Sequence, residues 1–148
     1  MPKWIFIGTR QRNYNMTEAG KENQTPKNLV SIVTFNVTAT KTIDGGVIPW
    51  VNIGRANEEI LNLIDADEIV IPAHEIKLSI DYPLAEPTTF HLFSSIGFSR
   101  KLLLIEIREK FLGLSKDELF DIFGLDLVAL DVYKTSSGHI EIILDIDF

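Results

Sequence analysis

The last ten residues of the chain alternate between two kinds of side chain, and this pattern constrains the fold more than any other. One side of segment 139–148 is entirely apolar, and the other is mostly charged. The apolar side carries Ile140, Ile142, Leu144, Ile146 and Phe148, whereas the opposite side carries His139, Glu141, Ile143, Asp145 and Asp147. A period of two is typical of a β-strand that packs one face on a core. The chain is therefore expected to form a sheet that a second layer covers on one side.

The segment from residue 74 to residue 138 has the pattern of two strands, two helices and a third strand. We expect strands over 74–81 and 88–95, a helix from Ser99 to about Leu112, a short helix from Ser115 to Phe123 and a strand over 127–134. In the longer helix, Leu103, Ile107 and Phe111 recur every four residues and form one apolar side. Gly113 is expected to end this helix, because glycine is common just after a helix. The sequence Ser115-Lys-Asp-Glu118 is typical of a capping box that starts the next helix.

The N-terminal half predicts a short strand over 3–7 and then a β-hairpin. The hairpin has one strand from Leu29 to about Thr40 and another over 47–53, joined by a turn at Asp44-Gly45-Gly46. Asn57 or a neighbour is expected to cap a short helix that ends near Asp65, and 68–72 is expected to be extended.

These elements predict a single domain over residues 1–148 of the α+β class. We expect a mostly antiparallel sheet of five to seven strands, packed on one face by two or three helices, because short turns favour antiparallel neighbours. The order of elements in the C-terminal half is similar to the β-grasp arrangement. This similarity concerns topology alone and implies no function.

A long polar segment precedes the first strand of the hairpin. From Thr9 to Asn28 the apolar residues are Tyr14, Met16 and Ala19. Loops longer than about 12–15 residues are uncommon in compact domains and are usually functional or disordered. The loop at about 9–28 is therefore either a mobile linker or a binding loop that orders on contact.

The net charge of −7 is distributed unevenly along the chain. Residues 1–50 hold six Lys or Arg and three Asp or Glu, whereas residues 51–148 hold eight Lys or Arg and eighteen Asp or Glu. An acidic body repels phosphate groups, so we expect no nucleic-acid partner. The same charge suits a basic protein partner.

Several classes of chemistry have no signature in this sequence. The chain contains no cysteine, which excludes a thiolate zinc site, an iron–sulfur cluster and a cysteine nucleophile. It also lacks the glycine-rich phosphate loops, the Gly-x-Ser-x-Gly elbow and the His-Glu-x-x-His motif. We expect no cofactor, no metal ion and no catalytic residue. No apolar run has the length of a signal peptide or a membrane span, which predicts a cytoplasmic protein that does not bind membranes.

The charged side of the last strand supplies the candidate binding residues, together with Asp131 on a neighbouring strand. Asp145 and Asp147 are about 7 Å apart at Cα, close enough to share Ca²⁺ or to act as paired carboxylates. The repeated charge could instead serve to prevent edge-to-edge pairing of sheets. As a third possibility, the strip, with His139 and Glu141, contacts a basic partner.

Trp50 is the candidate anchor for such a partner, since it follows Pro49 in an expected edge strand. The run from Lys101 to Ile107 is apolar on nearly all sides of its helix. It is either buried on more than one side or also contacts a second subunit.

Two of the three histidines, His74 and His91, lie on strands that should pair, so they could be cross-strand neighbours. We therefore weigh two functions. The favoured hypothesis is a small, acidic, non-enzymatic module that binds a protein partner through an acidic sheet face or an apolar helix, with a homodimer left open. The alternative is a small-ligand-binding protein or enzyme that uses the strand histidines and carboxylates.

Overall fold

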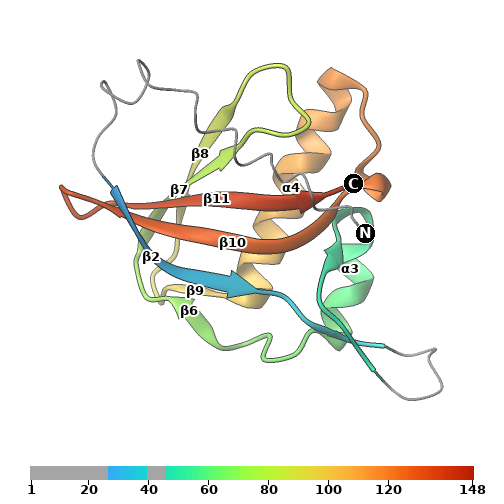
Figure 1. Cartoon of the computed structure of the whole chain (residues 1–148), viewed down its shortest axis with the longest axis horizontal. Helices are drawn as coiled ribbons and strands as arrows, with labels where there is room; N and C mark the ends of the chain where they lie inside the picture. Colours follow the sequence, from blue (N-terminus) through green and yellow to red (C-terminus); the bar gives the residue numbers. More distant parts are fainter. Residues whose placement is uncertain (1–26, 40–45) are drawn as a thin grey trace.

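The computed structural model describes residues 27–39 and 46–148. Its main feature is a six-stranded sheet (Figure 1). The strands are β2 (Lys27–Thr34), β5 (Val51–Asn52), β7 (Glu75–Ile80), β8 (Thr88–Phe93), β10 (Asp126–Thr135) and β11 (Ile140–Asp147). The order is β2-β10-β11-β7-β8, and β5 pairs with the first residues of β10. Within this sheet, β7 and β11 run parallel and the other pairs are antiparallel.

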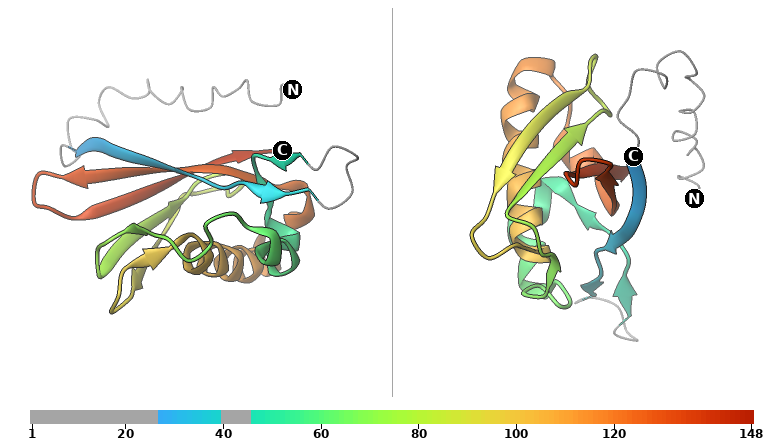
Figure 2. Two further views of the ribbon diagram at one scale, coloured as in Figure 1. Left: turned by 90° about the horizontal axis from the view of Figure 1, so that it is seen from below. Right: turned by 90° about the vertical axis from the view of Figure 1, so that its left-hand side faces the viewer.

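Helices cover one face of this sheet, as Figure 2 shows. The helical segments are η1 (Ile53–Arg55), α3 (Ala56–Glu59), η2 (Ile60–Asn62), α4 (Arg100–Glu118) and η3 (Ile122–Gly124). Two short ladders join β3 (Val37–Thr38) to β4 (Val47–Ile48), and β6 (Ile69–Ile71) to β9 (Phe98–Ser99). The predicted α+β class, with a mostly antiparallel sheet, is confirmed.

The C-terminal half keeps the predicted strand pairs on either side of α4, whereas the second predicted helix is reduced to η3. Its strands lie in the order β8-β7-β11-β10, with the parallel pair β7 and β11 in the centre. This topology is similar to the β-grasp arrangement. The parallel pair consists of β7 and β11, the first and last strands of the C-terminal half. Short turns predict antiparallel neighbours, so they do not predict this parallel pairing.

The hydrophobic core lies between the sheet and α4. The spacing of four residues along α4 is confirmed, because Leu103, Ile107 and Phe111 have no exposed surface. The alternation of β7 is confirmed as well, with Ile76, Leu78 and Ile80 buried. Four residues of the predicted apolar side of β11 face this core, namely Ile140, Ile142, Leu144 and Ile146, and Ile142 is fully buried. The fifth, Phe148, is 66 % exposed. Burial of a large aliphatic or aromatic side chain stabilises the fold by about 1.5–3 kcal/mol.

Ser99 caps the N-terminus of α4, as its sequence context predicts. The Oγ of Ser99 accepts a hydrogen bond from the backbone N–H of Leu102 at 3.0 Å. Ser99→Ala should lower the free energy of unfolding by about 1 kcal/mol, because one N–H at the start of the helix loses its partner. Urea denaturation measures this loss. Ser115→Ala is the matched control, since the Ser115 hydroxyl bonds the carbonyl of Leu112 inside the helix. Equal losses in the two variants would contradict the capping role.

The predicted break at Gly113 and the capping box at Ser115 are wrong. Helix α4 continues through Gly113 to Glu118 and ends where Leu119 adopts a left-handed conformation, with φ of 50°. A glycine inside a helix costs about 1 kcal/mol. Packing of Leu112 and Leu114 against the core offsets that cost. The short helix predicted to end at Phe123 is reduced to η3.

The predicted hairpin over residues 29–53 is largely replaced by pairing with the main sheet. Its ladder is limited to β3 and β4, while β2 and β5 both pair with β10. Strand β10 has ten residues and offers a longer edge than the hairpin could. The predicted cap at Asn57 or a neighbour is also wrong, because α3 begins at Ala56 without a side-chain cap. Asn52 caps η1 instead, with its side chain accepting from the N–H of Arg55 at 3.2 Å.

Some predictions fall on residues outside the described ranges. These are the strand over 3–7, the polar loop as far as residue 26, and the turn over 44–45. Lys27 and Asn28, the last two residues of the predicted loop, already belong to β2. Among the described residues, no helix combines the length and the apolar composition needed to cross a bilayer.

Candidate functional site

The face of the six-stranded sheet opposite α4, called here the outer face, carries the predicted binding residues. Residues that pair across neighbouring strands point to the same face, so the register arranges the outer face in rows. From one end of the sheet to the other, these rows are Asn52–Asp126–Asp147, Thr34–Ala129–Asp145, Ile32–Asp131–Ile143–Ser79–Thr89 and Leu29–Tyr133–Glu141–Lys77–His91. The predicted acidic strip therefore runs across several chemically different rows.

Glu141 is balanced by two lysines, Lys77 from the neighbouring strand β7 and Lys27 from β2, which lies beyond β10. Its Oε1 lies 3.2 Å from the Nζ of Lys27, and its Oε2 lies 3.6 Å from the Nζ of Lys77. The Nζ of Lys27 also lies 5.0 Å above the centre of the Tyr133 ring. Opposite charges within 4 Å cancel most of each other's field. Glu141 therefore adds little negative potential to the outer face.

His139 lies at the other end of β11 from the aspartates, beside the turn that joins β10 to β11. Its backbone N–H donates to the Oγ1 of Thr135 at 3.0 Å, and its Nδ1 lies 3.0 Å from the Oγ of Ser137. The backbone N–H of Thr135 in turn donates to the carbonyl of His139 at 2.9 Å. These contacts stabilise the turn. They hold His139 at the end of β11 that is opposite to Asp145 and Asp147.

The structure brings Asp145 and Asp147 together with Asp126, which the sequence did not single out. Asp126 is paired directly with Asp147, and Asp145 lies in the next row. Asn52 fixes this end of the sheet, because its Nδ2 donates to Asp126 Oδ1 at 3.0 Å and to the carbonyl of Phe123 at 2.9 Å. The pairing of Asp126 with Asp147 depends on strand register. The sequence offers one signal for it, namely that Asp126 comes just before the predicted strand over 127–134.

Trp50 lies at the same end of the sheet. It comes just before β5, where Val51 is buried, so alternation places Trp50 on the side of Asn52 and Asp126. The Trp50 side chain is 44 % exposed. Asp131 lies one row beyond Asp145. We call Trp50, Asp126, Asp131, Asp145 and Asp147 the acidic end.

The charge of the surrounding protein reinforces that of the acidic end. The described residues include nine Lys or Arg and eighteen Asp or Glu. Asp126, Asp131 and Asp147 also have interaction partners within the chain. A carboxylate offers about four lone-pair positions, so a partner that already contacts it leaves room for another donor. The acidic end is therefore suited to attract cationic side chains.

The expectation that His74 and His91 are cross-strand neighbours is wrong. His91 is opposite Lys77, whereas the carbonyl of His74 accepts a hydrogen bond from the N–H of Ser94 at 2.8 Å. His91 instead lies 3.4 Å from Glu75, in an exposed pair between Nδ1 and Oε2. Within residues 27–39 and 46–148, no three His, Asp or Glu side chains are grouped to hold a metal ion.

The apolar run on α4 is accounted for mainly by burial. Leu103, Leu104 and Ile107 have no exposed surface, while Ile105 is 40 % exposed.

At the end of the chain, the Tyr82 ring stacks on Phe148 with ring centres 4.4 Å apart. Desolvation by burial raises the pKa of Tyr82 above its ordinary value of 10.0.

A scan against protein-family models, a search of curated proteins and a search of solved structures gave no match. The function proposed below therefore depends on the residues of this chain alone.

Proposed function

We propose that this protein is a non-enzymatic interaction module that binds a basic protein partner through the acidic end of the outer face. One observation carries the proposal. The register gathers Asp145, Asp147 and Asp126 beside the half-exposed Trp50, while Lys27 and Lys77 balance Glu141 farther along the sheet. Negative charge and an aromatic anchor are thus concentrated at the same end.

The chemistry of the acidic end indicates what its partner should present. Clustered carboxylates attract Lys and Arg side chains and accelerate encounter with a positively charged surface. A tryptophan contributes a large apolar area, and tryptophan is enriched among residues that dominate binding energy. The expected partner surface therefore has basic residues around an apolar pocket. We infer that the encounter takes place in the cytoplasm.

Two observations favour the acidic end over α4 and over the strand histidines. On α4, most of the apolar run packs into the core, so the helix offers Ile105 rather than a broad apolar face. A homodimer through that helix, which the sequence left open, therefore has less support. The histidines that the enzymatic alternative would bring together are not opposite each other, because His91 pairs with Lys77.

The test compares two charge-reversal variants as bait. The first is Asp145→Lys with Asp147→Lys, which inverts the acidic end. The control is Glu58→Lys with Asp67→Lys, which makes the same charge change at exposed positions outside the sheet. Proteins captured from a lysate of the cells that make this protein are identified and quantified by mass spectrometry. Circular dichroism and thermal unfolding establish that both variants remain folded.

The wild type and the control should capture the same basic proteins. The Asp145→Lys, Asp147→Lys variant should capture them at least tenfold less, since reversing two carboxylates replaces attraction with repulsion of about 1 kcal/mol or more per close pair. Capture should also fall as salt is raised from about 0.05 to 0.5 M. Equal capture by the two variants, or capture of acidic proteins alone, would overturn the proposal.

A further inference from the structure

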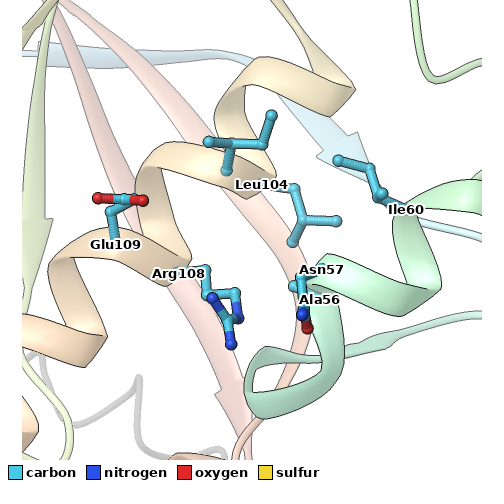
Figure 3. A pocket seen from close by; sticks show the side chains of 7 residues that line it. Ala56, Asn57, Ile60, Leu104, Arg108 and Glu109 are labelled. Atoms are coloured by element: carbon cyan, nitrogen blue, oxygen red, sulfur yellow. The ribbon is translucent and has the colours of Figure 1, made fainter.

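A groove of about 140 Å³ lies between α4 and the helical segment formed by α3 and η2 (Figure 3). Ala56, Ile60, Leu104 and Ile105 give it apolar walls, and Asn57, Arg108 and Glu109 add polar groups. It lies on the helical side of the sheet, whereas the acidic end lies on the outer face. It is therefore independent of the function proposed above.

Arg108 is the unusual residue of this groove. Its Nε is buried and has no hydrogen-bond partner in the part of the chain that the structure describes. Buried donors are nearly always bonded, because an unsatisfied one carries the full cost of its desolvation. Figure 3 shows Arg108 extending from α4 toward α3, beside Asn57, whereas Glu109 extends away from it.

The sequence of α4 shows why Arg108 finds no acidic partner on its own helix. Side chains three and four residues apart are neighbours on a helix, whereas adjacent ones are not. The positions at these spacings from Arg108 are apolar, namely Leu104, Ile105, Phe111 and Leu112. By contrast, Lys110 lies 3.2 Å from Glu106, four residues before it. Arg108 therefore carries a cation into a largely apolar groove.

We propose that this groove binds a short aliphatic carboxylate, with the carboxylate on Arg108 and the aliphatic part against Ile60, Leu104 and Ile105. A guanidinium matches a carboxylate through two parallel N–H···O bonds, which its two terminal nitrogens can supply. An apolar cavity of about 150 Å³ holds one benzene molecule in another protein, which indicates a ligand of about six non-hydrogen atoms.

The lining favours a carboxylate over a phosphate. A phosphate dianion needs several donors, and the groove offers one guanidinium and one carboxamide. Glu109 also lines the groove, and its negative charge disfavours a second charge on the ligand. The surplus of acidic residues in the described chain acts in the same direction.

The test is a titration of the ¹⁵N-labelled full chain with isobutyrate, which has six non-hydrogen atoms. Two-dimensional NMR follows the backbone amides and the Arg108 Nε–H. Isobutyramide, which has the same shape without the charge, and inorganic phosphate serve as comparison ligands. Arg108→Met removes the guanidinium, and Lys101→Met removes one positive charge from an exposed position on the same helix.

Isobutyrate should give saturable shifts at Asn57, Ile60, Ile105 and the Arg108 Nε–H, with a dissociation constant on the order of millimolar for a ligand of this size. Arg108→Met should weaken binding at least tenfold, and Lys101→Met should leave it within twofold. The proposal is overturned if isobutyramide or phosphate binds as well as isobutyrate, if the shifts lie elsewhere, or if no saturation is reached. The comparison of ligands uses the wild type, so it decides the matter even if Arg108→Met fails to fold.

Discussion

Phe111→Ala should lower the free energy of unfolding by about 3–5 kcal/mol, which is a large part of the 5–15 kcal/mol that a typical domain has. Phe111 has no exposed surface and lies on the side of α4 that faces the sheet. Its ring also contacts the ring of Phe120 edge-on, with centres 6.1 Å apart. Removing the ring leaves a cavity that the rigid sheet on the other side cannot fill.

Phe93→Ala is the matched control for this prediction. Phe93 is the same residue type, but it is 71 % exposed on β8. Its replacement should change stability by less than about 1 kcal/mol. Chemical denaturation of the two variants gives both values. Losses of similar size would contradict the placement of the core between α4 and the sheet.

Gly54→Ala should also destabilise the protein, by about 1–3 kcal/mol, although it adds one methyl group. A Cβ at Gly54 would lie 2.6 Å from the Cδ1 of Phe123 and 2.9 Å from its Cα. Because one of these atoms belongs to the backbone, the ring cannot simply rotate away. The segment after β5 would have to move relative to η3, and Asn52 would lose its bond to the carbonyl of Phe123.

A double-mutant cycle isolates this steric effect. Phe123 is 57 % exposed, so Phe123→Ala alone should cost less than the loss of a buried ring. In the double variant the two closest contacts disappear. The loss of unfolding free energy caused by Gly54→Ala should therefore be at least about 1 kcal/mol smaller in the Phe123→Ala background than in the wild type. Additive losses in thermal or urea unfolding would show that the close approach of Phe123 is not the cause.

Local patterns predicted the elements of the C-terminal half well. The alternation along β7 and β11, the apolar spacing of α4 and the Ser99 cap each depend on residues within a few positions of one another. Gly113 shows the limit of such reasoning. Tertiary packing can override the tendency of a glycine to end a helix, and here Leu114 continues the contact with the core.

Features that depend on strand order could not be predicted in this way. The sequence of β2 predicts a hairpin, because nothing in it reveals that the edge of β10 is nearby. The same holds for the candidate site. Asp145 and Asp147 were found by their spacing, but the pairing of Asp126 with Asp147 follows from the register of β10 and β11. The balance of Glu141 by Lys27 requires two strands that are distant in the chain.

Carboxyl footprinting tests the proposed interaction surface most directly. The protein, alone and bound to a captured partner, is treated with a carbodiimide and glycine ethyl ester, and each labelled Asp and Glu is quantified by mass spectrometry. We predict that the partner protects Asp145 and Asp147 from labelling and leaves Glu58, Asp67 and Glu109 as reactive as before. Unchanged labelling of Asp145 and Asp147, with protection of Glu109 on α4, would contradict binding through the acidic end.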